Sequence, residues 1–454
     1  MGWYRRSLEL DAALAGKRLF LHFEGANQVA EVFVNGRAVG RHVGGYTAFT
    51  FDVTDFVRRD APNIIAVRVD NSHSADIPPL NGDFTFYGGI YRDVWLVATA
   101  PVHITMADHG SSGVFVDTPN VSDTSATVRI RGTVTNELAT AQRVTVVSRV
   151  VDSQQREVTM LRATVDVAPK ASASFHQLST ALPNVRLWSP ESPAMYRVYT
   201  TVQVNGVSVD EVYSPLGFRR FHADAGRGFL LQGKPYRLFG TNRHQDRAGY
   251  ANALPDWAHR EDVSLIKNAG FNFLRLAHYP QDPAVLDAAD REGLVVWEEI
   301  PVVNLISLSQ AFADNSEYML VEMIRQHYNH PSVALWGYMN EVLLQPPRPE
   351  PAGYRERIVS LAKRLDARAH REDSTRQTVT AISIEEIDNG TGMQDVPDVL
   401  GFNLYFGWYY RRLDGLGAYL DTLHRRHPTR PVLVSEYGAD SDERIHTANP
   451  RAFD

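Results

Sequence analysis

The sequence predicts a chain of three parts: a jelly-roll β-sandwich, an immunoglobulin-like β-sandwich and a (β/α)8 TIM-type barrel that lacks its last strand. Up to about residue 218, many short segments alternate polar and apolar residues, which is the period of half-buried strands. From about residue 219, apolar strands alternate with amphipathic helices, as in parallel sheets. The length of 454 residues is enough for about three domains.

Residues 1–100 are predicted to form the first sandwich. Segments such as RLFLHFEG (18–25) and NIIAVRVDN (63–71) alternate polar and apolar residues. Asn35-Gly36 lies between two such segments, and this dipeptide is a strong signal for a two-residue hairpin turn. Many short strands with Gly and Pro turns favour a jelly roll.

Residues 101–218 continue the β pattern and are predicted to form the second sandwich. The alternation is clear in SATVRIRGTVTN (125–136) and YRVYTTVQVNG (196–206). A segment of this length has the size of an immunoglobulin-like domain.

Residues 219–454 are predicted to form an incomplete barrel. Amphipathic helices are expected at 255–270, with a Gly stop, and at 283–293, with a Pro start and a Gly stop. A closed barrel needs eight strands, so we expect the last strand to be missing and the chain to be truncated at its C-terminus. The seven candidate strands are 236–244, 271–278, 294–301, 333–341, 378–383, 399–406 and 431–438.

The composition excludes several classes of function. The formal net charge is -7 and no basic stripe interleaves with aromatic residues, so no nucleic-acid partner is expected. The absence of cysteine excludes disulfides, thiolate catalysis and cysteine-ligated metals. No apolar run reaches 18 residues, so no membrane partner is expected. No signal peptide is visible, which favours a cytoplasmic location if the sequence begins where the protein begins.

Two carboxylates stand at the ends of apolar strands. Glu341 ends VALWGYMNE (333–341), and Glu436 ends PVLVSE (431–436). In a barrel of this type the carboxyl ends of the strands face the active site, and the fourth and seventh strands lie on opposite sides of its mouth. Two such carboxylates, about 5–5.5 Å apart, can hydrolyse a glycosidic bond with retention of configuration. The alternative is that each Glu is only a helix cap or a surface residue.

Other polar side chains fall at matching strand ends. Converging amide, hydroxyl and imidazole groups suit a polyhydroxylated substrate, whereas the alternative is that buried polar groups satisfy one another, which we favour for His244 taken alone. Arg275 is expected to hold a carboxylate ionised, and its partner, Glu436 or a structural acid, is left open. These polar residues are Asn242, His244, Arg275, His278, Glu298, Glu299, Asn340, Asn403 and Tyr405.

Five segments, in the right order, resemble those of glycoside hydrolase family 2. NFLRLAHYPQDPAVLDAADREGLVVW (272–297) is similar to the family's Arg and His-Tyr-Pro segment, and HPSVALWGYMNE (330–341) to its acid/base segment. PVLVSEYGAD (431–440) resembles the nucleophile segment. GTNRHQD (240–246) and NGDFTFYGGIYRDVWL (81–96) resemble segments of the first barrel strand and the jelly roll. The Asn-Glu and His-Tyr-Pro segments together are highly specific.

The resemblance implies a sugar-binding-like jelly roll over 1–100, an immunoglobulin-like domain over 101–218 and a catalytic barrel over 219–454. It implies a retaining glycosidase with Glu341 as acid/base and Glu436 as nucleophile. The WYRR start of the chain normally lies inside the first domain of the family, so the opening strand is also expected to be missing.

The resemblance also implies the residues around the sugar. Asn340 would lie near the 2-hydroxyl, and His244 and His278 would bind the sugar. Arg275 and Tyr405 would contact the nucleophile. Asp83 would reach over the barrel mouth, and Trp408 would be a stacking wall for the leaving group.

The substrate is less sharply indicated than the reaction. GTNRHQD, LAHYPQDP and EYGADSDERIH most resemble bacterial β-galactosidases, so we expect hydrolysis of terminal β-galactosides or related oligosaccharides. β-Glucuronidases and β-mannosidases share the catalytic pair and stay as alternatives, and a glucuronate-reading Asn-x-Lys motif would lie beyond residue 454. An inactive or carbohydrate-binding fragment is the alternative outside catalysis, because a missing strand leaves unpaired edges.

No cofactor is expected. Some galactosidases of the family bind magnesium through a Glu and a His after the third strand, but EEIPVVNLISL (298–308) has apolar residues there, so no metal site is expected. A homo-oligomer is left open.

Overall fold

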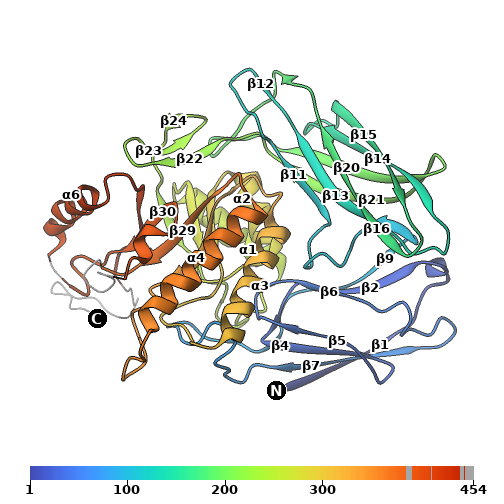
Figure 1. Ribbon diagram of the computed structural model, residues 1–454, viewed down its shortest axis with the longest axis horizontal. Helices are drawn as coiled ribbons and strands as arrows, with labels where there is room; N and C mark the ends of the chain where they lie inside the picture. The colour runs from blue at the N-terminus through green and yellow to red at the C-terminus, as the bar shows by residue number, and fades with distance from the viewer. Residues whose placement is uncertain (385–390, 411, 440–443, 445–454) are drawn as a thin grey trace.

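The computed structural model describes residues 1–384, 391–410, 412–439 and 444, and it confirms the predicted fold class (Figure 1). The barrel and its helices form one body, and the two β-sandwiches lie beside it on the right of the view. No sheet contains strands from more than one of the three parts. We keep 1–100, 101–218 and 219–454 as the proposed division.

The first sandwich is made of two antiparallel sheets, ordered β1-β7-β4-β5 and β6-β2-β9, and a short β3-β8 pair. Buried and partly exposed residues alternate along β4, as the sequence pattern predicted. The Asn35-Gly36 hairpin joins β4 to β5, with φ of 53° and 78°, values that glycine and asparagine tolerate best. The strands are β1 (Gly2–Leu8), β2 (Arg18–Phe23), β3 (Ala26–Asn27), β4 (Val29–Val34), β5 (Arg37–Val43), β6 (Phe49–Asp52), β7 (Asn63–Asp70), β8 (Gly89–Ile90) and β9 (Val94–Thr99).

The second sandwich packs a sheet in which β10, β11 and β16 pair with β13 against a sheet ordered β15-β14-β20-β21. Every second residue of β13 is buried, and a core of mainly Val and Ile fills the space between the sheets. The strands are β10 (Val102–Ile104), β11 (Val114–Asp117), β12 (Ser125–Ala126), β13 (Arg129–Asn136), β14 (Gln142–Val151), β15 (Glu157–Val167), β16 (Ala171–Leu178), β17 (Leu182–Pro183), β18 (Trp188–Ser189), β19 (Ser192–Pro193), β20 (Tyr196–Val204) and β21 (Val207–Leu216).

The barrel consists of seven parallel strands in sequence order, preceded by a small antiparallel sheet. All residues of β26, β27, β28 and β30 are buried, because side chains fill the barrel on one face and helices cover the other. The small sheet holds β22 (Phe221–Asp224), β23 (Gly228–Leu231) and β24 (Lys234–Pro235), and the barrel holds β25 (Gly240–Asn242), β26 (Phe273–Leu276), β27 (Val295–Glu299), β28 (Val333–Asn340), β29 (Gln377–Ile382), β30 (Val399–Asn403) and β31 (Val432–Glu436).

The two helices predicted from start and stop signals, at 255–270 and 283–293, are present as α1 and α2. Asp282 caps α2, Pro283 is its first residue and Gly293 follows its end in the left-handed conformation. Within the described ranges, no helix combines the length and apolar character needed to cross a bilayer. The helices are α1 (Asp256–Asn268), α2 (Pro283–Glu292), α3 (Gln310–His327), α4 (Tyr354–Glu372) and α6 (Leu416–Arg426), with short 3-10 turns at Ala12–Leu14, Met393–Asp395 and Leu413–Gly415.

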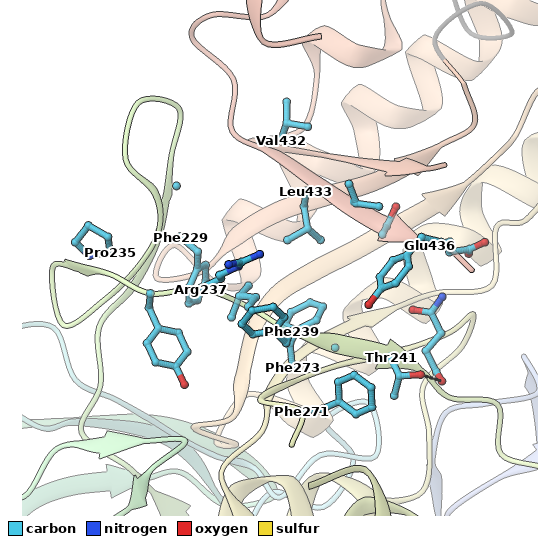
Figure 2. A pocket seen from close by; sticks show the side chains of 18 of the residues that line it. Phe229, Pro235, Arg237, Phe239, Thr241, Phe271, Phe273, Val432, Leu433 and Glu436 are labelled. Carbon is cyan, nitrogen blue, oxygen red and sulfur yellow. Dashed lines mark hydrogen bonds between the residues drawn. The ribbon is translucent and has the colours of Figure 1, made fainter. Parts of the chain in front are cut away.

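The barrel is open between its first and last strands. β25 and β31 lie at the two ends of the sheet, and no strand of the described chain joins them. A cavity of about 870 Å³ occupies the gap, with Phe239 and Thr241 on one side and Leu433 and Glu436 on the other (Figure 2). The first strand is also shorter than the predicted 236–244, because only residues 240–242 pair with a neighbouring strand.

The first sandwich is attached to the barrel by buried polar contacts. Arg92 donates to the side chain of Gln245 at 2.9 Å and to the carbonyl of Pro280 at 2.8 Å. Glu322 on α3 accepts hydrogen bonds from Thr47 at 2.6 Å and contacts Nε2 of His42 at 2.9 Å. Because buried hydrogen bonds are costly to break, these contacts fix the first sandwich relative to the barrel.

Candidate active site

Glu341 and Glu436 lie at the same end of the barrel. Glu341 directly follows β28, and Glu436 is the last residue of β31. The carboxyl ends of parallel strands meet at one edge, so the two side chains share the barrel mouth. The two carboxyl groups are close enough to interact, because the charge of Glu436 contributes to raising the pKa of Glu341.

The backbone of Glu341 is held in an uncommon conformation. Its φ of 48° lies in the left-handed region, which costs a non-glycine residue about 1–3 kcal/mol. Its N–H donates to the carbonyl of Ala381 at 2.9 Å, and its carbonyl accepts from Leu344 at 2.8 Å. These contacts fix the direction in which the carboxyl group leaves the strand.

Glu341 is set up to hold a proton. Burial, and then the charge of Glu436, raise its pKa to about 7, while a hydrogen bond from Asn403 opposes the rise. A carboxyl group with a pKa near neutrality exists in both protonation states under ordinary conditions. That is the property needed by a group that donates a proton in one step and accepts one in another.

Glu436 is surrounded by hydrogen-bond donors. Nη1 of Arg275 donates to Oε1 at 2.7 Å, and the hydroxyl of Tyr405 donates to Oε2 at 2.7 Å. Each carboxylate oxygen therefore has one strong donor, which stabilises the negative charge. Burial, and then the charge of Glu436, raise the pKa of Tyr405, so its hydroxyl keeps its proton.

Arg275 binds two carboxylates, so both partners left open by the sequence are present. Besides Glu436, it contacts Glu299 through Nε at 3.0 Å and Nη2 at 2.8 Å. The arginine is fully buried. Burial alone would lower its pKa, but the charges of Glu299 and Glu436 outweigh this effect and raise it. For Glu299 the effects have the opposite sign: burial alone would raise its pKa, but Arg275 and His278 hold that pKa below its usual range.

Three expected sugar ligands line the same mouth. Nδ1 of His278 lies 2.7 Å from Glu299, and its Nε2 lies 3.8 Å from Glu436. Nδ1 of His244 lies 3.0 Å from the hydroxyl of Tyr279, and the two histidine rings are 5.5 Å apart. The oxygen of Asn340 accepts from Arg275 at 2.9 Å. The structure therefore brings these three side chains together with both glutamates.

Two further expected residues lie at the rim. Asp83 is exposed on the loop between β7 and β8, and its charge acts on His244. Trp408 lies 6.1 Å from Tyr409, whose ring contacts Tyr405 at 4.9 Å. The segment EYGADSDERIH is only partly described, because residues 440–443, 445 and 446 lie outside the described ranges.

Glu299 is one of the polar residues expected at strand ends, but no role was predicted for it. Glu298 and Glu299 are neighbours on β27, and neighbours on a strand point to opposite faces. Glu298 points outward and contacts His327 of α3 at 2.7 Å, whereas Glu299 points into the barrel toward Arg275. Strand alternation predicts that one of the two lies inside, but not which one.

One cluster of potential metal ligands lies away from this mouth. Asp287, Asp290 and His330 are the group in the described chain whose ligand atoms lie within 4.8 Å of one another. His330 precedes β28, so the cluster sits at the opposite end of the barrel. Asp290 already contacts Nδ1 of His330 at 2.7 Å and accepts from the backbone of Ser332 at 2.9 Å. This arrangement is a buried contact between His330 and Asp290 that secures the start of β28.

Models of known families match all three parts of the chain. The "Glycosyl hydrolases family 2, TIM barrel domain" matches residues 225–454. The sugar binding domain of the same family matches residues 1–100, and a third model, "Glycosyl hydrolases family 2", matches residues 112–219.

Relatives of the chain are named as enzymes acting on two kinds of sugar. A β-glucuronidase of Bacteroides fragilis is 38% identical over 97% of this chain and 62% of its own length. A β-galactosidase of Bacteroides ovatus is 33% identical over 76% of this chain and 40% of its own length. The crystal structure of a Bacteroides uniformis β-glucuronidase superposes with a TM-score of 0.96 at 42% identity, over 99% of this chain and 54% of that one.

These matches follow the order of the three parts and include the strands that carry Glu341 and Glu436. The chain spans just over half to about 62% of the length of the two β-glucuronidases. With its barrel model alone covering half of the sequence, the chain belongs to glycoside hydrolase family 2.

Proposed function

We propose that this chain carries the active site of a retaining β-glycosidase. The observation that carries the proposal is the contrast between the two glutamates at the barrel mouth. Glu341 has its pKa raised to about 7, whereas Glu436 accepts hydrogen bonds from Arg275 and Tyr405. One group is suited to donate a proton and the other to attack as a carboxylate, which is the division of roles in double displacement.

In the first step, protonated Glu341 gives its proton to the glycosidic oxygen as the bond to the anomeric carbon breaks. An oxygen of Glu436 attacks that carbon and forms a covalent glycosyl ester. In the second step, Glu341 takes a proton from water, the water attacks the same carbon, and Glu436 leaves as a carboxylate. Two inversions give overall retention.

The charge coupling supports this reversal of roles. When Glu436 is esterified, it loses its negative charge, and one cause of the raised pKa of Glu341 disappears. The pKa of Glu341 then falls at the stage when it must act as a base. Arg275 and Tyr405 hold Glu436 throughout, and we propose His244, His278, Asn340 and Asp83 as ligands of sugar hydroxyls, with Trp408 as a wall on the leaving-group side.

For the sugar, we propose a β-glucuronide first and a β-galactoside second. The two β-glucuronidases are 38% and 42% identical to the chain, against 33% for the β-galactosidase. The motifs GTNRHQD and LAHYPQDP favour the β-galactoside. Arg275 already pairs with Glu299 and Glu436. The carboxylate of a glucuronide would therefore have to pair with a different cationic side chain.

The second candidate is a carbohydrate-binding role without turnover. It is favoured by the match of residues 1–100 to the sugar binding domain of the family.

Hydrolysis of p-nitrophenyl β-glucuronide, β-galactoside and β-mannoside tests these alternatives. We expect turnover of one of them by the wild type, and none by Glu436→Gln. Glu211→Gln, which changes a carboxylate on β21 of the second sandwich, is the matched control and should be as active as the wild type. Binding of the sugars without turnover by the wild type would support the non-catalytic role, and unchanged activity of Glu436→Gln would refute the assigned nucleophile.

A further inference from the structure

Phe84 is an aromatic side chain of the first sandwich that lies against the barrel mouth. Its ring centroid is 5.2 Å from that of His244, 6.0 Å from His278 and 5.3 Å from Tyr279. All three partners follow the carboxyl ends of β25 and β26. Phe84 therefore contacts both histidines proposed to bind the sugar, although it has no polar atom of its own.

The loop that carries Phe84 is shaped to hold this ring. A Cβ atom on Gly82 would lie 2.6 Å from the Phe84 ring, so a residue without a side chain is needed there. Phe86 packs on Phe84 with ring centroids 5.0 Å apart. Asn81 donates to Gln345, and the carbonyl of Tyr87 accepts from Asn27, so the loop is secured on both sides of Phe84.

The hydrogen bonds of the two histidines give their rings different roles. The hydroxyl oxygen of Tyr279 accepts from the backbone of Gln245 at 3.3 Å, so its proton is available for Nδ1 of His244 at 3.0 Å. His244 then carries its own proton on Nε2 and acts as a donor. His278 donates from Nδ1 to the ionised Glu299, which leaves Nε2 as an acceptor when the ring is neutral. A donor and an acceptor side by side suit neighbouring sugar hydroxyls.

Resting on the proposed function, we propose that Phe84 is a positioning residue for the sugar. Its ring holds His244 and His278 in the orientation that meets the sugar hydroxyls, and it excludes water from them. The first sandwich would then take part in catalysis through this apolar contact as well as through Asp83.

Exclusion of water has a consequence that can be measured at His244. Burial, and then the neighbouring His278, lower the pKa of His244 to about 4. Asp83, Asp246 and Glu436 oppose this shift, and Tyr279 and Phe84 complete its surroundings. Removing the Phe84 ring admits water, which raises the pKa of His244, so that the charged, non-productive form persists to higher pH.

Three variants test the proposal on the aryl glycoside that the wild type hydrolyses best. For Phe84→Ala we expect a higher KM, a fall of kcat/KM by about tenfold to 100-fold, and an acidic limb of the pH profile displaced to higher pH. Phe84→Leu keeps apolar cover and should recover most of the loss. Phe33→Ala removes a half-buried ring that packs on Trp3 in the same sandwich, and it should leave kcat, KM and the pH profile unchanged.

Equal behaviour of Phe84→Ala and Phe33→Ala, with no change in KM or pH profile, would overturn the role of Phe84. Should the wild type hydrolyse no glycoside, the proposed function fails, and NMR titration of His244 decides about Phe84 separately. A raised pKa of His244 in Phe84→Ala, restored in Phe84→Leu, supports the contact, whereas an unchanged titration rejects it.

Discussion

The barrel mouth and the opposite end of the barrel both bury charged side chains, but they pair them differently. At the opposite end, between α4 and β29, Asp373 contacts Nη1 of Arg376 at 2.6 Å and accepts from the indole of Trp336 at 3.0 Å. Burial opposes ionisation there, but Arg376 outweighs it and lowers the pKa of Asp373 to about 2. At the mouth, Arg275 is shared by two other carboxylates, and Glu341 has no ion pair among the described residues.

The partner of a buried carboxylate decides whether it serves stability or can take part in proton transfer. A buried carboxylate with its own cation stays ionised and stabilises one arrangement of the chain. A buried carboxylate whose nearest strong charge is another carboxylate can change its protonation state near neutral pH. Replacing single groups in the two regions should therefore change activity in one and stability in the other.

Apart from the loss of turnover in Glu436→Gln, the largest effect is expected from Glu341→Gln. Because the amide cannot give a proton to the leaving group, kcat for an alkyl glycoside should fall by about 10²–10⁴-fold. A dinitrophenyl glycoside, whose leaving group needs little protonation, should lose much less in the first step. Values of kcat/KM for both substrates report the first step and measure the difference, and the melting temperature should stay close to that of the wild type. Equal losses of kcat/KM on the two substrates would contradict the role as acid.

Asp373→Asn should act on stability instead. The change leaves Arg376 buried without its carboxylate, and breaking such a pair costs about 3–5 kcal/mol of unfolding free energy. The folded-state pKa of Asp373 is lowered to about 2, so its stabilisation is present above the unfolded value of about 3.9 and is lost as pH falls toward 2. Urea unfolding at several pH values should show the gap between wild type and variant shrinking in acid. A constant gap would mean that ionisation of Asp373 is not its source.

Tyr405→Phe should have a smaller effect on activity. It removes the hydroxyl that donates to Glu436 at 2.7 Å, and a hydrogen bond to a charged group contributes about 1.5–3 kcal/mol. We expect kcat to fall by about 10- to 100-fold, with little change in stability. Phe402→Leu, which changes an apolar core residue on β30, the strand that precedes Tyr405, is a control for altered packing. A larger loss in that control than in Tyr405→Phe would weaken the assignment.

Much of the fold could be predicted from the sequence because its signals are local. Strand alternation located the two sandwiches, Asn35-Gly36 located a hairpin, and Pro283 with Gly293 bounded α2. The count of seven barrel strands also needed only runs of apolar residues between helices. Each of these signals lies within a few residues of the element that it predicts.

The site was only partly predictable because several of its contacts join distant segments. Strand ends pointed to Glu341 and Glu436, but not to the sharing of Arg275 between Glu299 and Glu436, which depends on which face of β27 lies inside. Phe84 approaches His244 from another domain across 160 residues, and no local pattern marks such a contact. The resemblance pointed to Trp408, whereas no signal in the sequence marked Tyr409, whose ring contacts that of Tyr405.

The smallest effect is expected on the pKa of Glu341 in Glu436→Gln. This measurement tests directly whether one buried carboxylate changes the pKa of the other. This variant removes the negative charge but keeps the burial, and burial is the larger cause of the raised pKa. The pKa should therefore fall below about 7 and still remain above the ordinary value for a glutamate, as the esterified intermediate would require. Infrared difference spectra of the carboxyl C=O band across a pH titration report this shift, with Glu341→Gln identifying the band. An unchanged pKa would show that burial alone raises the pKa of Glu341. The charge of Glu436 would then have no effect on it, and esterification of Glu436 could not turn Glu341 from an acid into a base.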